Sequence, residues 1–351
     1  MLVPAPASGY HPGVEGPEVL YRYRGAIEQE VARCLPADGS SLNEMLRYQL
    51  GWTSGGGVSL GGKGLRPSLC LLACEAMGGD VDQALPIAAS IELIHNFSLI
   101  HDDIEDGDEL RYHRPALWSL YGRDQAVAAG LALWTLAYQT LNRSLERGLP
   151  ADVVLEARRI LNDACSEMIE GQHLDLSYEL RIDVTLPDYI EMISRKTAAL
   201  LSAALKAGAL VAGARGEELE RFAVFGRQLG LAFQIRDDIL GIWGEGTATG
   251  KPVGADIARK KKTLPIVQAF EQVVGPDREL LRTVYSNDAV QDEDIDAVLA
   301  ILQRWNCRYF AQGLAEDYRS RAMAALSQTH IQFDARRQFD ELTSFILERD
   351  Y

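Results

Sequence analysis

Apolar residues recur at three- and four-residue spacing along most of this chain, in segments far longer than a β-strand. The clearest segments cover residues 65–77, 84–106, 152–176 and 218–244. The alternation of apolar and polar residues that marks half-buried strands is nearly absent. Because a helix brings residues three and four apart onto one face, this pattern predicts an all-α fold.

Glycine and proline clusters separate these segments. The clusters at residues 55–64, 148–150 and 244–254 each predict that a helix starts directly after them. Residues 1–18 are rich in Pro and Gly and predict a flexible N-terminal arm. This leaves residues 19–351 as one all-helical domain.

The composition and charge of the chain exclude some classes of function. The 351 residues, 47% of them hydrophobic, are enough to bury the core of an enzyme. Asp and Glu outnumber Lys and Arg by 50 to 35, and the formal net charge of -15 repels nucleic acid, which we exclude as a partner. The five cysteines are scattered, without ligand-like pairs. No apolar stretch reaches about 18 residues, and the N-terminus lacks the basic region followed by an apolar region that marks a signal peptide. We therefore expect a cytoplasmic protein with reduced thiols and no integral membrane segment.

Two apolar segments run into aspartate pairs. Asp102 and Asp106 are four residues apart, so a continuing helix places both carboxylates on one face, with Asp103 about 100° round. Asp237 and Asp238 follow the apolar residues GLAFQI in the same way. Carboxylates at such a helix end repel one another unless a cation bridges them, and hard oxygen ligands favour Mg²⁺ or Mn²⁺. A solvated acidic helix end is the alternative, but the apolar residues before each pair favour the metal.

Basic residues accompany both acidic clusters. They are Lys63 and Arg66 in GGKGLRP, then Arg111, Arg114, Lys196, Lys251 and Lys260 to Lys262. Any one of them alone is typical of a solvated surface charge. Because protein-bound Mg²⁺ usually keeps coordination positions for phosphate oxygens, the combination predicts a ligand with a diphosphate group and an apolar tail.

Six ordered motifs between about residues 61 and 265 resemble the trans-isoprenyl diphosphate synthase (polyprenyl synthetase) family. They are GGKGLRP, LIHDDIED followed by LRYHRP, EGQHLDL, Lys196-Thr197, QIRDDILG and GKPVGADIARKKKTLP. The resemblance implies a single bundle of long helices around a central cavity, usually in a homodimer. It also implies a Mg²⁺-dependent prenyltransferase that condenses an allylic diphosphate with isopentenyl diphosphate to a short-chain prenyl diphosphate.

The resemblance assigns roles to the matching positions of this chain. The implied Mg²⁺ ligands are Asp102, Asp106 and Asp237, with Asp103 and Asp238 in support. The implied contacts of the allylic diphosphate are Arg111, Lys196 and Lys251. The implied contacts of the isopentenyl diphosphate are Lys63, Arg66 and His95, and Lys261 is a further substrate-binding residue. Thr197 and Gln234 would face the developing allylic cation, as catalytic residues beside Lys196.

Phe97 and Ser98 stand five and four residues before Asp102 on the same apolar segment. At 1.5 Å per residue they lie about 6–7.5 Å along the helix axis from the acidic motif. The resemblance implies that bulk at these two positions forms the floor of the cavity and limits product length. Because only Phe97 is large, we predict geranylgeranyl diphosphate as the product, then farnesyl diphosphate, then longer chains.

Three positions depart from the family pattern. Tyr112 stands where the family usually has a second Arg, Gly241 where it has Asp, and AAGLALW where it commonly has Gly-Asp. A class I terpene cyclase is one alternative, because it also ionises a prenyl diphosphate at an Asp-rich metal site. GGKGLRP and His95 argue against it. A non-catalytic partner subunit of a prenyltransferase is another alternative, and the retention of both acidic clusters argues against that.

Overall fold

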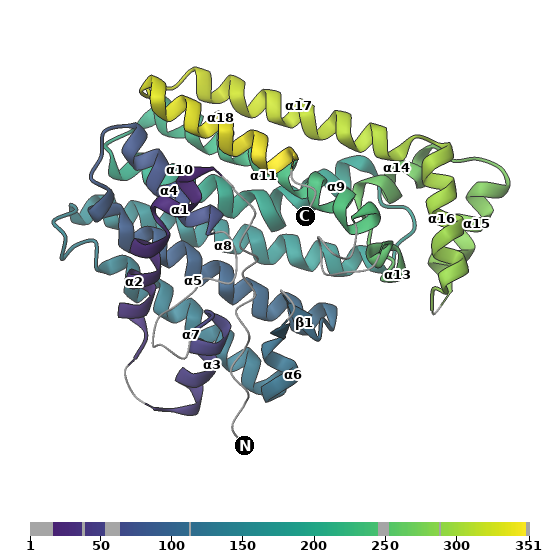
Figure 1. The fold of residues 1–351 in the computed structure, drawn as a ribbon, viewed down its shortest axis with the longest axis horizontal. Helices are drawn as coiled ribbons and strands as arrows, with labels where there is room; N and C mark the ends of the chain where they lie inside the picture. Colours follow the sequence, from purple (N-terminus) through teal and green to yellow (C-terminus); the bar gives the residue numbers. More distant parts are fainter. Residues whose placement is uncertain are drawn as a thin grey trace. The chain divides into compact units, whose positions relative to one another are not determined.

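A computed structural model describes residues 17–36, 39–52, 64–111, 114–244, 253–287 and 289–348. These residues are almost entirely helical, which confirms the all-α prediction (Figure 1). The strands in the described ranges are β1 (Leu110–Arg111) and β2 (Arg114–Pro115), an antiparallel pair in which Arg111 faces Arg114. No helix in these ranges is both long and apolar enough to cross a membrane.

The helices of these ranges follow one another closely, and most connections between them are short. In chain order they are α1 (Glu18–Arg22), α2 (Arg24–Cys34), α3 (Ser41–Gln49), α4 (Leu65–Ala76), α5 (Val81–Asp106), α6 (Leu117–Tyr121), α7 (Arg123–Asn142), α8 (Ala151–Glu179), α9 (Leu186–Ile193), the π-helix η1 (Ser194–Ala198), α10 (Ala199–Val211), α11 (Gly216–Trp243), α13 (Ala255–Ala258), α14 (Leu264–Gln272), α15 (Pro276–Ser286), α16 (Asp292–Arg304), α17 (Cys307–Ser327) and α18 (Phe333–Glu348).

The predicted helix starts are confirmed. α4 begins directly after Gly64, and α13 begins directly after Gly254. Both glycines have positive φ, 59° and 77°, a backbone conformation that side chains disfavour. Pro150 immediately precedes α8. Most of the predicted N-terminal arm lies outside the described residues.

The chain divides into two compact units, and each is described by itself. The first comprises residues 1–163, 203–223 and 329–342, and the second comprises residues 164–202, 224–328 and 343–351. That residues 19–351 form one domain stays a prediction.

α5 is the central helix of the first unit. It packs against α2, α4 and α7, and it lies alongside α7 (Figure 1). Every residue from Ala84 to Ile94 is buried, which fits a helix that is apolar on all sides and surrounded by other helices.

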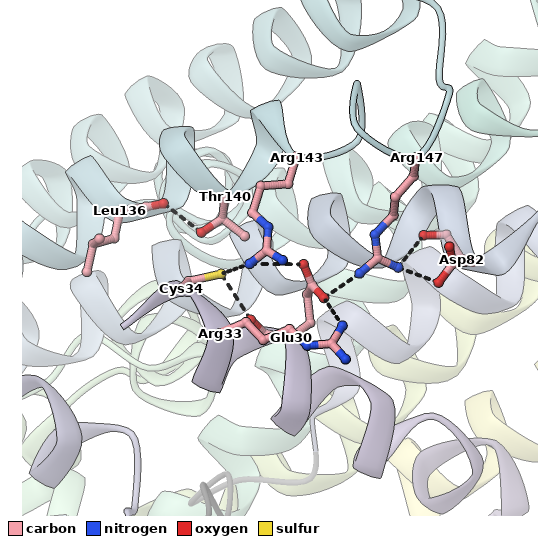
Figure 2. Close-up of polar contacts among 8 residues, drawn as sticks. All are labelled: Glu30, Arg33, Cys34, Asp82, Leu136, Thr140, Arg143 and Arg147. Carbon is pink, nitrogen blue, oxygen red and sulfur yellow. Dashed lines mark hydrogen bonds and ion pairs between the residues drawn. The ribbon is translucent and has the colours of Figure 1, made fainter. Parts of the chain in front are cut away.

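An ion-pair network ties α2 to the segment after α7 and to the start of α5 (Figure 2). The Glu30 side chain has no exposed area and pairs with Arg33 at 3.3 Å, Arg143 at 3.6 Å and Arg147 at 2.5 Å. Arg147 also pairs with Asp82 in the first turn of α5. The carboxylate of Glu30 is therefore neutralised from three sides, which is what burial of a charge requires.

The second unit has two apolar clusters. The first joins Tyr189 and Ile193 of α9 to Ile235 and Ile239 of α11 and Leu264 of α14. The second continues from the end of α11 into α14, α15 and α16, through Ile242, Ile266, Leu281 and Leu302 among others. These clusters fix the relative placement of α9, α11 and α14, and these three helices carry or support the second acidic motif.

Candidate active site

The first acidic motif lies in the last two turns of α5. Asp106 is the last helical residue, and Gly107, with φ 68°, ends the helix directly after it. Asp102 and Asp106 are both partly exposed. Because they are four residues apart on one continuous helix, they share a face, as the spacing predicts.

Asp103 turns away from that face and holds Arg111. Its side chain is 2% exposed, and the Nε and Nη2 atoms of Arg111 both lie 2.6 Å from its Oδ1. Burial raises the pKa of Asp103 to about 6, although Arg111 opposes the shift. The carboxylate therefore fixes a guanidinium beside the acidic motif, at a position where the resemblance implies a contact with the allylic diphosphate.

Arg66 and His95 lie together in the first unit, as their shared predicted role requires. Arg66 is in the first turn of α4, and its Nη1 lies 3.2 Å from His95 Nε2. Because a guanidinium only donates, Nε2 accepts and the imidazole is neutral. Burial, with Arg66 and Arg111 nearby, holds the pKa of His95 well below its usual value. His95 therefore orients Arg66 and adds no positive charge of its own.

Phe97 packs against α7. It is 8% exposed, and its ring centroid lies 4.8 Å from that of His101 and 6.4 Å from that of Trp134. A Cβ at Gly130 would lie 2.5 Å from His101 Nε2, so the glycine in AAGLALW leaves room for this imidazole. The Ser98 hydroxyl donates to a backbone carbonyl of its own helix over 2.8 Å. That these residues limit product length stays a prediction.

The second acidic motif lies near the end of α11 in the second unit. Asp237 is partly exposed, whereas Asp238 is 5% exposed. Asp238 accepts hydrogen bonds from Gln234 Nε2 at 3.0 Å, the Tyr189 hydroxyl at 2.7 Å and the Leu264 amide at 2.9 Å. Burial raises the pKa of Asp238 to about 7, against the effect of these three donors.

The catalytic residues expected from the resemblance stand on the π-helix η1. Thr197 Oγ1 donates to Gln234 Oε1 over 2.6 Å, and Lys196 Nζ donates to Asp175 Oδ2 over 2.5 Å. π-helical turns are rare in proteins, and those that occur often lie at functional sites. Here it turns Lys196 toward α8 and Thr197 toward α11.

Gly171 of α8 lets the backbone of η1 approach closely. A Cβ at this position would lie 2.6 Å from Lys196 Cα and nearer still to the Lys196 amide. Gly171 and Asp175 both belong to the motif EGQHLDL. The motif therefore supplies the room for η1 and the carboxylate for Lys196.

Gly241 has a neighbour that accounts for its departure from the family pattern. A Cβ at position 241 would lie 2.6 Å from Asp256 Cγ of α13. The carboxylate of Asp256 thus already fills the space where a side chain at 241 would begin.

The run of three lysines after α13 splits between surface and interior. Lys262 is 3% exposed, and its Nζ donates to the carbonyls of Glu179 and Lys260, both at 3.1 Å. Burial lowers the pKa of Lys262 to about 8. Lys261 is partly exposed, and its amide donates to the Asp256 carbonyl over 3.0 Å. Lys261, unlike Lys262, therefore keeps the surface position that substrate binding needs.

Some predicted residues cannot be placed. Lys63, Lys251 and Tyr112 lie outside the described residues. Asp102 and Asp106 belong to the first unit and Asp237 to the second, so the prediction that their carboxylates share metal ions stays a prediction.

Sequence reasoning missed three residues that support the site: Asp175, Tyr189 and Asp256. The motif EGQHLDL singles out the first, but its role emerges only from the contact with Lys196. Tyr189 looks like a core aromatic in sequence, because nothing there marks a partner 49 residues away.

Comparison with known proteins places the whole arrangement in one family. Residues 54–302 match the polyprenyl synthetase family. A short chain isoprenyl diphosphate synthase from Methanothermobacter thermautotrophicus is 41% identical over 295 residues, covering 84% of this chain and 88% of the relative. A (2E,6E)-farnesyl diphosphate synthase from Mycobacterium bovis is 36% identical over 314 residues, covering 88% and 86%.

A solved structure extends the likeness to the fold. The crystal structure of geranylgeranyl pyrophosphate synthetase from Pyrococcus horikoshii Ot3 matches with a TM-score of 0.85 and 33% identity. The match covers 95% of this chain and 98% of the other. The resemblance seen in the motifs is thereby confirmed, and this chain belongs to the polyprenyl synthetase family.

Proposed function

We infer that the protein is a trans-prenyltransferase of the short-chain class, which condenses an allylic diphosphate with isopentenyl diphosphate. One observation carries this inference: six motifs that resemble the family's occur in its order, and residues of most of them make mutually supporting contacts. Asp103 holds Arg111, His95 holds Arg66, and Asp175 holds Lys196. In each pair, an acceptor orients a cation that is suited to a diphosphate.

Mg²⁺ is the proposed metal, with Asp102, Asp106 and Asp237 as its ligands. The donor set fits, because all three are carboxylates and Mg²⁺ prefers hard oxygen ligands. Within the described ranges, no three acidic, His or Cys side chains are arranged to hold a metal ion on their own. Mg²⁺ bound by few carboxylates keeps coordination positions that phosphate oxygens of the substrate can fill. When bound, the metal neutralises the charge of the departing diphosphate.

Residues of the chain bind the substrates and stabilise the charges that develop during the reaction. Arg111 and Lys196, with Lys251, bind the allylic diphosphate and stabilise the charge that grows on it as the C–O bond ionises. Thr197 and Gln234 face the allylic cation with oxygen lone pairs. The isopentenyl double bond attacks that cation, and the released diphosphate can take the final proton. No protein general base is required.

Arg66, ordered by neutral His95, binds the isopentenyl diphosphate together with Lys63. Lys261 is a further substrate-binding residue. Tyr112 replaces an Arg of the family at this second site. Arg114 follows Tyr112 by two residues in the sequence. Its Nη2 donates to the Tyr48 carbonyl over 3.0 Å, and its guanidinium lies over the face of the Tyr48 ring.

Geranylgeranyl diphosphate is the proposed product. Relatives of similar identity are named for products of different length, so overall likeness does not decide the matter. The proposal is supported by the two predicted chain-length residues: Phe97 is large and buried against α7, whereas Ser98 is small.

The homodimer is also a proposal. Val127, Leu131 and Trp134 are 37–50% exposed and lie four and three residues apart on α7, so they form one apolar stripe on the helix surface. An exposed stripe of this kind is typical of an interaction site. A cytoplasmic location stays a prediction.

The deciding experiment is incubation of the purified protein with Mg²⁺, isopentenyl diphosphate and dimethylallyl, geranyl or farnesyl diphosphate. We expect elongated prenyl diphosphates, released as alcohols only after phosphatase treatment. Cyclic hydrocarbons formed without isopentenyl diphosphate would identify a terpene cyclase instead, and no turnover of any substrate would favour the partner-subunit alternative.

The metal assignment has its own test. Asp102→Ala is expected to lower turnover by about 10³-fold or more, because the charge in the transition state loses part of its clamp. Circular dichroism is expected to match that of the unmodified protein. Near-normal turnover of this variant would contradict the assignment.

A further inference from the structure

Four side chains of the second unit form a continuous hydrogen-bond chain. Tyr189 OH donates to Asp238 Oδ2 over 2.7 Å, Gln234 Nε2 donates to Asp238 Oδ1 over 3.0 Å, and Thr197 Oγ1 donates to Gln234 Oε1 over 2.6 Å. Three elements contribute: α9, η1 and α11. Tyr189 is fully buried and Thr197 is 6% exposed, so water does not compete for most of these contacts.

The direction of the chain is set by Asp238. Its carboxylate accepts from the Tyr189 hydroxyl and the Leu264 amide, and the amide nitrogen of Gln234 faces it as the third donor. The amide oxygen then faces Thr197, whose hydroxyl has to donate to that oxygen. The Thr197 hydroxyl proton is thus used in the hydrogen bond to Gln234. The lone pairs of the Thr197 oxygen form the end of the chain and can accept.

Asp238 has little capacity left for a metal ion. Its two oxygens already accept from Gln234, Tyr189 and the backbone amide of Leu264. Only 5% of the residue is exposed, whereas its neighbour Asp237 is partly exposed. The two adjacent aspartates therefore stand in different surroundings and suit different tasks.

We propose that Asp238 and Tyr189 are positioning residues, which act through Gln234 and Thr197, and that Asp238 is not a metal ligand. The proposal rests on the proposed function, in which Thr197 and Gln234 face the allylic cation. Each donor along the chain points toward the negative charge of Asp238. Such a chain polarises its members cooperatively and raises electron density on the Thr197 oxygen, where a cation is stabilised.

Asp238→Asn tests the polarity of the chain while keeping its shape. The Asn oxygen can still accept from Tyr189 and Leu264, which places the Asn nitrogen against Gln234 and forces the Gln234 amide to turn. Thr197 then meets an NH₂ donor instead of an acceptor, and its oxygen lone pair is consumed. We expect kcat to fall by about 10²-fold, with the KM values of both substrates unchanged.

A second readout separates positioning from metal binding without turnover. Binding of inorganic diphosphate is measured by calorimetry at increasing MgCl₂ concentration, for the unmodified protein, Asp238→Asn and the matched control Asp237→Asn. We expect Asp237→Asn to weaken the Mg²⁺-dependent binding by about tenfold or more, since it removes a proposed ligand charge. Asp238→Asn is expected to bind as the unmodified protein does.

Four further variants link the residues to one another. Thr197→Val keeps the size of the side chain and removes the hydroxyl, so it is expected to lower kcat as Asp238→Asn does, whereas Thr197→Ser is expected to restore most of it. The double variant Asp238→Asn with Thr197→Val should lose little more than either alone, because both remove the same chain. Tyr189→Phe, which removes one of three donors to Asp238, is expected to cost roughly 5- to 10-fold in kcat.

The proposal is overturned if Asp238→Asn weakens Mg²⁺-dependent diphosphate binding as much as Asp237→Asn does, or if its loss multiplies with that of Thr197→Val. If Asp238→Asn does not fold by circular dichroism, Tyr189→Phe and the Thr197 variants still decide, since an unchanged kcat in Tyr189→Phe contradicts the chain. If the unmodified protein binds diphosphate with Mg²⁺ yet condenses no substrate, the proposed function fails, and the binding comparison still shows whether Asp238 is a metal ligand.

Discussion

Glycine residues decide how closely the backbones of the site approach one another. Among the described glycines of the second unit, Gly171 makes the tightest approach to backbone atoms, because a Cβ there would lie 2.6 Å from Lys196 Cα and nearer still to the Lys196 amide, and backbone atoms cannot rotate away. The position of Lys196 therefore depends on the absence of a methyl group at residue 171. The same holds for the adjacent Thr197, which donates to Gln234.

Gly171→Ala is accordingly expected to destabilise the fold by roughly 1–3 kcal/mol through overpacking and to displace η1. Thermal unfolding and turnover measure the two effects. Gly313→Ala in α17 is the matched control, since a Cβ at that position meets nothing within 4 Å. Because Ala is a better helix former than Gly, the control is expected to stabilise by about 0.5–1 kcal/mol. Equal melting temperatures for the two variants would contradict the close approach.

The chemistry of single residues could be predicted only in part from the sequence. The spacing of Asp102 and Asp106 places them on one helix face, and the structure confirms it. The commitments of Asp103 to Arg111 and of Asp238 to Tyr189 could not be predicted, because spacing along one helix does not reveal donors on other elements. Lys262 looks like its neighbours in sequence, yet burial separates it from them.

At the scale of elements, helices were predictable because their apolar periodicity is strong and glycine or proline marks their starts. The π-helix η1 was not, since its wider turn follows from the packing of α8 and α11 around it and leaves no compositional signal. The two-residue strands β1 and β2 were also not predicted, because two residues are too few to show the alternation that marks a strand.

The ion pairs of Glu30, which connect α2 to its neighbours, are expected to contribute to the free energy of unfolding. Glu30→Gln removes the charge that neutralises Arg143 and Arg147, whose side chains are 28% and 14% exposed. Breaking a buried ion pair on one side costs about 3–5 kcal/mol, so denaturant unfolding is expected to show a loss in that range. Glu156→Gln is the control, because its pair with Arg159 is exposed and is worth less than about 1 kcal/mol. Equal losses would mean that the Glu30 network is energetically a surface feature.

We predict that product length depends on α5 and α7 together. Phe97→Ala removes the ring that packs against His101 and Trp134, and we expect products longer by at least one isoprene unit. Ser98→Phe adds bulk on the same helix and is expected to shorten the product. Chromatography of the dephosphorylated alcohols measures both shifts. If neither substitution changes the distribution, another helix forms the floor of the cavity.

At the scale of the whole molecule, the surface of α7 predicts self-association. Val127, Leu131 and Trp134 expose an apolar stripe on the same helix whose other face packs on α5. Leu131 belongs to AAGLALW, which stands where the resemblance predicts Gly-Asp, and this stretch has no charged residue. Burial of a stripe against its copy would remove that apolar area from water.

Leu131→Glu places a charge in the stripe and is expected to convert the proposed dimer to monomers, because an unpaired carboxylate at an apolar contact is costly to bury. Sedimentation velocity at micromolar concentration distinguishes the two states. Leu180→Glu is the control: Leu180 is 93% exposed and lies outside the stripe, so the variant should sediment as the unmodified protein does. A monomeric unmodified protein, or a Leu131→Glu variant that remains dimeric, would contradict an interface on this face of α7.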